Sequence, residues 1–370
     1  MDMTDSAIYI AATGQNVGKT TLCLGILAAL KKKLQKIGFI KPLGQRHVKI
    51  GDQLSVDKDV LLFKEHFQLP YQYEHMSPVI LPAGFTKRFL DGKYSTKSLS
   101  EKIQRGFDHI ASQSNYTIVE GTGHVGVGSI VGLSNAQVAS LLGLDMVIIA
   151  SGGLGSAFDE LAQNISMCKQ YGVNVRGVIL NRVHDDKRAM LLDYFPKALK
   201  KWNIPLIGCI PFNDLLSKPC VQDFEALLNT QLIAGNKHRC RHFTDNRLVA
   251  DSVDSFRRES QPNQLVITPA CREDIINAFI DKHTNSSFDY GGGMILTGKN
   301  PPSFEVTQKI KQIDLPVLYA PLCSYDVMKQ ITTFIAKICM EDTSKVERAI
   351  SLAEEFIDFD QLCRNPKVKI

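Results

Sequence analysis

Short apolar runs alternate with longer stretches of helical periodicity through the first 220 residues of the chain. The runs are rich in isoleucine and valine and apolar at successive positions, as in strands buried on both faces of a parallel sheet. They lie at residues 7–12, 37–40, 116–119, 146–150, 177–180 and 206–210. Helical spacing fills the segments between them, for example 20–36 and 158–171. The alternation predicts an α/β fold with a doubly wound, mainly parallel sheet, in which ligands bind at the carboxyl ends of the strands.

The pattern becomes polar and basic from 231 to 262, where it ends in Ser260-Gln261-Pro262. We expect this stretch to be a linker that leads into a second, smaller α/β unit. Strands are expected at 265–268, 293–297 and 316–320, and helices at 272–282 and 303–313. The expected domains are therefore 1–230 and 263–370, with the linker between them.

Composition narrows the class of protein without identifying it. The 370 residues are 44% hydrophobic and 22% charged, with a net charge of +5, which is ordinary for a globular protein. The basic clusters lack interleaved aromatic residues, so we expect no nucleic acid partner. An acidic N-terminus and the absence of long apolar runs predict a cytoplasmic protein with no membrane segment.

The cysteines do not suggest a disulfide framework or a zinc site. There are nine, an odd number, and no two form a Cys-x-x-Cys pair. Cys23 and Cys209 lie in apolar runs and are expected to be buried free thiols. The triplet His238-x-Cys240-x-His242 matches no common zinc spacing.

The clearest chemical motif is the sequence AATGQNVGKTT at residues 11–21, which follows an apolar strand and opens a helix. That context is typical of a phosphate-binding loop, where backbone N–H groups and the helix N-terminus face the phosphates of a nucleotide. Lys19 would place its charge on the β and γ phosphates, and Thr20 would ligate Mg²⁺ through its hydroxyl group. The usual pattern has glycine at the position of Thr13, whereas here glycine follows at Gly14. The expected nucleotide-binding residues of the loop are Thr13, Gly14, Asn16, Val17, Gly18, Lys19, Thr20 and Thr21.

Charged residues follow two other predicted strands. Lys41 ends the second strand and could add charge at a transferring phosphoryl group, although a surface lysine before a turn would look the same. Glu120 ends the run at 116–119 and precedes a glycine-rich turn, so it could hold Mg²⁺ directly or through water. Asp59 opens a helical pattern and is a second candidate ligand, with Asp57 as the alternative.

Taken in order, these motifs resemble the dethiobiotin synthetase branch of P-loop proteins, within the wider group that includes the cobyrinic acid amide synthases. The resemblance covers residues 6 to about 225 and rests on six stretches: VGKT at 17–20, Lys41-Pro42, Asp59, VEGTG at 119–123, LNRV at 180–183, and GCIP at 208–211. It implies ATP and Mg²⁺ as cofactors, catalytic roles for Lys19 and Lys41, and metal ligands at Thr20, Asp59 and Glu120. It also implies that Asn181 contacts the nucleotide base, that Pro211 is a nucleotide-binding residue, and that the protein is a homodimer.

A narrower resemblance is to the N-terminal region of long bacterial phosphate acetyltransferases, which joins a dethiobiotin-synthetase-like domain to a DRTGG domain. The sequence KPLGQ at 41–45 is similar to that region, and LVITPACRED at 265–274 resembles a DRTGG segment. Cys271 stands where that family usually has aspartate, and Lys299 where a second glycine is common. The chain ends at Ile370, so we expect the acetyltransferase domain to be absent.

Two functions stay open at this point. The first is an ATP-dependent enzyme that activates a carboxylate or carbamate of an unidentified acceptor as a phosphoric anhydride. The second is a nucleotide-sensing regulatory protein with little or no turnover. His124, in the turn after Glu120, is a candidate pocket residue or an ordinary loop histidine.

Overall fold

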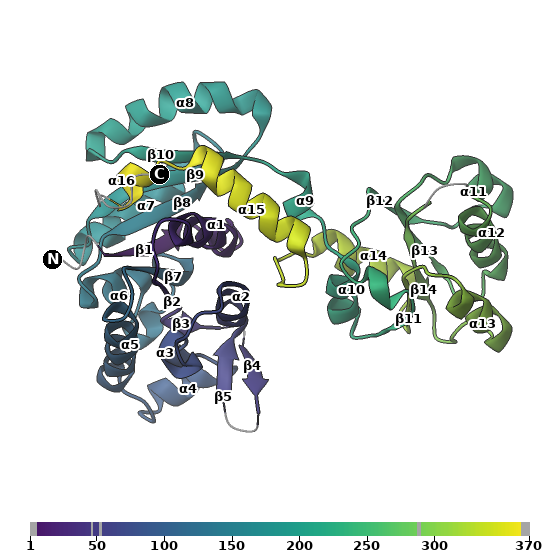
Figure 1. Ribbon diagram of the computed structural model, residues 1–370, viewed down its shortest axis with the longest axis horizontal. Coiled ribbons are helices and arrows are strands. Elements are labelled where there is room, and N and C mark those ends of the chain that lie inside the picture. The colour runs from purple at the N-terminus through teal and green to yellow at the C-terminus, as the bar shows by residue number, and fades with distance from the viewer. Residues whose placement is uncertain (1–5, 46, 52–53, 287–289, 364–370) are drawn as a thin grey trace. The chain divides into compact units, whose positions relative to one another are not determined.

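A computed structural model describes residues 6–45, 47–51, 54–286 and 290–363. The chain forms two compact units (Figure 1). Unit 1 comprises residues 1–213 together with 338–370, and unit 2 comprises residues 214–337. No helix within the described ranges is long and apolar enough to cross a membrane.

Unit 1 is built on a six-stranded sheet in the order β10-β9-β8-β1-β7-β2, and every neighbouring pair is parallel. Its sheet strands are β1 (Ala7–Ala12), β2 (Ile37–Ile40), β7 (Tyr116–His124), β8 (Met146–Ser151), β9 (Val175–Val183) and β10 (Leu206–Pro211). Its other strands are β3 (Leu43–Gly44), β4 (His47–Ile50), β5 (Leu54–Asp57) and β6 (Val79–Ile80). Its helices are α1 (Lys19–Lys31), α2 (Lys58–Phe67), α3 (Tyr73–Met76), α4 (Phe85–Leu90), α5 (Thr96–Ala111), η2 (Ser129–Val131), α6 (Asn135–Leu141), α7 (Ser156–Gln170), α8 (Asp185–Leu199), η3 (Lys200–Trp202), α15 (Thr343–Phe356) and α16 (Phe359–Cys363).

The order of the strands places a change of direction at β1. From β1 the chain moves to β2 on one side, whereas β8, β9 and β10 follow one another on the other side. In open α/β sheets, ligands bind outside the carboxyl ends of the strands at such a switch point. The loop that follows β1 is therefore placed where this fold class binds its ligand. The sheet confirms the predicted doubly wound, mainly parallel architecture.

Unit 2 has a five-stranded sheet in the order β11-β15-β14-β13-β12, in which only the β11–β15 pair is antiparallel. Its strands are β11 (Leu232–Ala234), β12 (Asp245–Leu248), β13 (Gln264–Pro269), β14 (Gly293–Thr297) and β15 (Val317–Ala320). Its helices are α9 (Asp214–Ser217), α10 (Val221–Leu228), η4 (Asn236–His238), α11 (Val253–Glu259), α12 (Glu273–Thr284), α13 (Phe304–Gln312) and α14 (Ser324–Thr333). One core cluster includes Phe256 of α11, Phe279 of α12 and Ile310 of α13, and a second includes Phe224 of α10 and Ile331 of α14.

The structure divides the chain differently from the expected ranges. Residues 231–262, expected as a linker, contain strands β11 and β12 and helix α11. The polar pattern there reflects edge strands, whose residues stay partly exposed. The segment from 338 onward belongs to unit 1, although it was expected in the second domain.

The chain returns to unit 1 with helix α15, which lies along α1 (Figure 1). The two helices approach closely at Gly25, where a Cβ atom would come within 2.4 Å of Ala353 Cβ and 2.7 Å of the Ala349 carbonyl oxygen. After α15, Asp358 N donates a hydrogen bond to Ile207 O of β10 at 2.8 Å. The same segment therefore contacts both the helix after the first strand and the last strand of the sheet.

Replacing Gly25 with leucine should destabilise unit 1 selectively. The added side chain has no space against the α15 backbone, and overpacking of this kind costs about 1–3 kcal/mol. Trp202, the single tryptophan, lies in unit 1, so its fluorescence during urea unfolding reports on that unit. Gly155→Ala is the control, because a Cβ there meets no atom within 4 Å. Equal stability of the two variants would contradict close packing of α15 on α1.

Candidate functional site

The loop after β1 turns back sharply before α1 begins. Asn16 has φ 58° and Gly18 has φ 103°, so two left-handed residues shape the turn. Asparagine tolerates this conformation better than most residues, and Gly18 also has no space for a side chain. A Cβ on Gly18 would lie 2.2 Å from Asn181 Nδ2. Asn181, at the end of β9, donates a hydrogen bond to Val17 O at 2.7 Å and so holds the loop in place.

Lys19, the first residue of α1, turns its ammonium group back over the loop. Its Nζ donates to Gly123 O at 2.6 Å and to Gly14 O at 3.2 Å. The residue is 8% exposed, and burial lowers the pKa of Lys19 to about 8 despite the nearby Glu120 carboxylate. An ammonium group that has lost its water and contacts only carbonyl oxygens gains strongly from an anionic ligand.

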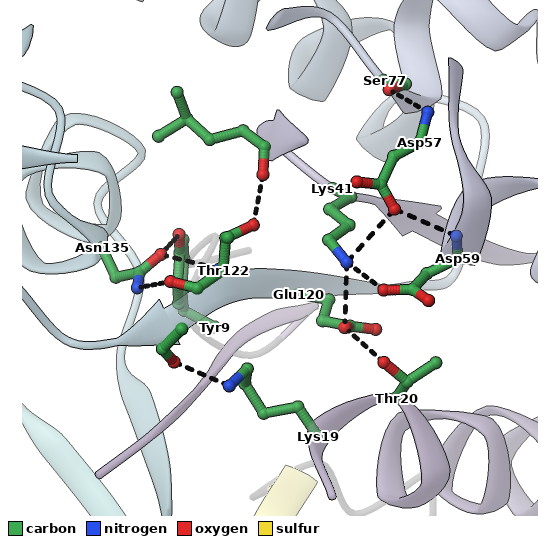
Figure 2. Close-up of polar contacts among 12 residues, drawn as sticks. Tyr9, Lys19, Thr20, Lys41, Asp57, Asp59, Ser77, Glu120, Thr122 and Asn135 are labelled. Atoms are coloured by element: carbon green, nitrogen blue, oxygen red, sulfur yellow. Dashed lines mark hydrogen bonds and ion pairs between the residues drawn. The ribbon is translucent and has the colours of Figure 1, made fainter. Parts of the chain in front are cut away.

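Lys41 is surrounded by carboxylates, as Figure 2 shows. Its Nζ pairs with Asp59 Oδ2, lies 3.3 Å from Asp57 Oδ1 and lies 3.5 Å from Glu120 Oε1. Burial alone would lower the pKa of Lys41, but Asp59, Glu120 and Asp57 outweigh it and raise the pKa above its usual value. Lys41 is therefore a buried, charged group rather than a surface lysine.

The two aspartates have different local roles. Asp57 is the N-cap of α2, where its Oδ1 accepts a hydrogen bond from Asp59 N at 3.0 Å. Its own backbone N–H donates to Ser77 Oγ at 3.2 Å. Asp59 lies in the first turn of α2 and pairs directly with Lys41. Asp57 therefore caps helix α2, and Asp59 is the stronger candidate of the two as a ligand of Mg²⁺.

Glu120 contacts both Lys41 and Thr20, the second residue of α1. Its Oε1 accepts a hydrogen bond from Thr20 Oγ1 at 2.9 Å, while Oε2 is buried with no hydrogen-bond partner among the described residues. Burial raises the pKa of Glu120, opposed by the charge of Lys41 and the Thr20 hydroxyl. A buried carboxylate oxygen without a partner is costly, and a bound cation would satisfy it.

Sequence reasoning missed a polar network beneath this site. Asn135 Oδ1 accepts from Tyr9 OH at 2.9 Å and from Thr122 N at 3.2 Å (Figure 2). Its Nδ2 donates to Thr122 O at 2.8 Å and to His124 O at 2.7 Å. The buried amide therefore fixes the last residues of β7, where a turn was expected and where the Gly123 carbonyl holds Lys19. The one available signal was Tyr9, a hydroxyl group in an otherwise apolar strand.

Four other candidate residues lie in α1, in the loop after β1, in β10 and in β7. Thr21 is in the first turn of α1, and the Thr13 side-chain oxygen is buried without a partner among the described residues. Pro211 ends β10 opposite Val183 of β9. His124 is exposed and accepts a hydrogen bond from Gly126 N at its Nδ1, at 3.1 Å. The roles of all the candidate ligands stay predictions.

Two matched variants test the network. Asn135→Ala removes four hydrogen bonds, one buried and three partly buried, and should lower the free energy of unfolding by about 3 kcal/mol. Tyr9→Phe removes a single hydrogen bond and should lower it by about 1 kcal/mol. Urea unfolding followed by Trp202 fluorescence measures both, and similar values for the two variants would count against a central role of Asn135.

Comparisons with known proteins agree with this architecture. A family model described as an AAA domain matches residues 6–220, and one described as a DRTGG domain matches residues 225–334. The phosphate acetyltransferase of Pseudomonas aeruginosa is 29% identical over 382 residues, covering 97% of this chain and 52% of that protein. The probable cobyric acid synthase of Methanococcus maripaludis is 24% identical over 241 residues, covering 60% of this chain and 48% of that protein.

Among solved structures, the MinD cell division protein of Aquifex aeolicus matches with a TM-score of 0.35 and 16% identity, covering 57% of this chain and 84% of that chain. The chain spans about half the length of the phosphate acetyltransferases it matches. These findings confirm the resemblance to phosphate acetyltransferases and the presence of a DRTGG domain after the P-loop domain.

Proposed function

The chain belongs to the AAA-domain family, and we propose that unit 1 binds ATP with Mg²⁺ and acts on its terminal phosphoryl group. The observation that supports this most directly is that Lys19, after β1, and Lys41, after β2, both contact β7, at Gly123 and Glu120 respectively. Two ammonium groups beside a phosphate-binding loop offset the negative charge of a triphosphate and of a phosphoryl group in transfer.

The side chains at the site fit a magnesium ion. Thr20 Oγ1, Glu120 and Asp59 offer oxygen ligands, which Mg²⁺ prefers, and the unpartnered Glu120 Oε2 indicates a position for a cation. When bound, Mg²⁺ supplies positive charge that neutralises the phosphate oxygens. Asp57 holds the start of α2, and with it Asp59, in position.

With an acceptor that carries a carboxylate or carbamate, transfer of the terminal phosphoryl group would activate the acceptor as a phosphoric anhydride, as in a ligase. This part of the proposal rests on the similarity to a cobyric acid synthase and on the motifs shared with dethiobiotin synthetases. The acceptor is unassigned. A homodimer is proposed on the same family resemblance.

A regulatory function is the second candidate, and the connectivity of the chain favours it. The DRTGG unit begins directly after β10, and the chain returns from it into α15, which packs on α1, the helix that starts at Lys19. Both connections of unit 2 therefore lead to elements next to the nucleotide site. A change of α1 on nucleotide binding could be transmitted through them.

Isothermal titration with a non-hydrolysable ATP analogue and Mg²⁺ tests the proposed function. We expect micromolar binding to the wild type and an affinity about tenfold to a hundredfold lower for Lys19→Ala, which loses charge-assisted hydrogen bonds. Absence of binding to the wild type would refute the proposal. Steady-state phosphate release then separates the two candidates, because a sensor would bind without appreciable turnover.

The magnesium requirement distinguishes the two aspartates. Asp59→Asn should raise the Mg²⁺ concentration for half-maximal nucleotide binding by about tenfold or more, because a charged ligand is lost. Asp57→Asn should have a smaller effect, since asparagine also caps a helix N-terminus well. The reverse order of effects would assign Asp57 as the ligand.

A further inference from the structure

Two ammonium groups and the Glu120 carboxylate lie in one half of the unit 1 sheet. Lys19 follows β1, Lys41 follows β2 and Glu120 lies within β7, and these strands are neighbours in the order β1-β7-β2. A terminal phosphate that meets both lysines must lie on that side. The nucleoside end of the ligand then extends the other way, over β8, β9 and β10. The outermost of these strands lies three strand spacings from β1, or roughly 14 Å.

Two aromatic rings stand at this far end. His184 directly follows β9 and Phe212 directly follows β10. The rings stack with centroids 4.9 Å apart and an angle of 23° between their planes. Phe212 N donates to Val183 O at 2.7 Å, so the backbone of one strand end is fixed to the other. The stacked pair is therefore held in place by the sheet itself.

The pair is also accessible. His184 is exposed, and Phe212 is 37% exposed although it is a large apolar side chain. A single exposed aromatic residue is ordinary on a protein surface. This one differs because it is supported by a second ring and lies at the edge of the sheet where this fold binds ligands. Asn181, in the same strand as Val183, is hydrogen-bonded to the phosphate loop, which connects the two regions.

We propose that Phe212, supported by His184, forms an aromatic shelf on which the planar base of the nucleotide stacks. This inference rests on the proposed function, because it assumes that a nucleotide occupies the loop. Stacking on an aromatic side chain is available to every base, since each has a π face. The shelf therefore adds affinity for the nucleoside part of the ligand and does not by itself select adenine.

The test compares a ligand that has a base with one that lacks it. Binding of a non-hydrolysable ATP analogue and of inorganic tripolyphosphate, each with Mg²⁺, is measured for the wild type and for Phe212→Ala. We expect Phe212→Ala to weaken analogue binding by about tenfold or more, with tripolyphosphate binding unchanged. Phe212→Leu, which keeps apolar volume without a ring, should behave in the same way. Phe212→Trp should retain affinity.

A control and an optical readout make the test sharper. Tyr194→Ala removes an aromatic side chain that is 52% exposed on α8, and it should change neither affinity. In the Trp202→Phe background, the new tryptophan of Phe212→Trp should change its fluorescence with the ATP analogue but not with tripolyphosphate.

The outcomes separate the shelf from the nucleotide site. If Phe212→Ala leaves analogue binding unchanged, or weakens both ligands equally, the shelf is refuted while the loop proposal stands. If the wild type binds neither ligand, both proposals fail.

Discussion

Burial of the Lys41 ammonium group is the constraint on which the carboxyl edge of the first sheet depends. At 6% exposure the group cannot stay charged without partners. Its partners come from three places in the chain: the cap of α2, the first turn of α2 and the middle of β7. Their convergence fixes how β2, α2 and β7 lie relative to one another. The same requirement explains why Asp57 serves at once as a helix cap and as a counter-charge.

The site as a whole carries three carboxylates against two ammonium groups. Lys19 contacts backbone carbonyl oxygens, one of them that of Gly123 in the last residues of β7. The position of this lysine thus depends on the amide of Asn135, which holds those residues and itself accepts a hydrogen bond from Tyr9. The geometry is preorganised by neutral hydrogen bonds as well as by charge, which is what electrostatic stabilisation of a phosphoryl group needs.

Many of the strands and the phosphate loop could be predicted from the sequence, because both depend on local patterns. The strands at Ala7–Ala12, Ile37–Ile40 and Gly293–Thr297 end where their apolar runs end, and a phosphate loop has a recognisable local context. Contacts between distant segments were not accessible. The link from Asn135 to Tyr9 spans 126 positions, and nothing near either residue indicates it. The edge strands of unit 2 looked like a linker, since partly exposed strands lack a continuous apolar run.

The return of α15 to unit 1 has a consequence for how the protein forms during synthesis. A helix that completes the first unit leaves the ribosome only after all 124 residues of the second unit, from 214 to 337, have been made. The second unit is continuous in sequence and can fold as soon as it emerges, whereas the face of α1 around Gly25 stays uncovered until the chain returns. The contacts between α1 and α15 join segments more than 300 positions apart, which makes them the slowest kind of contact to form. Of the two units, unit 1 is thus the first to be synthesised in part and the last to be completed.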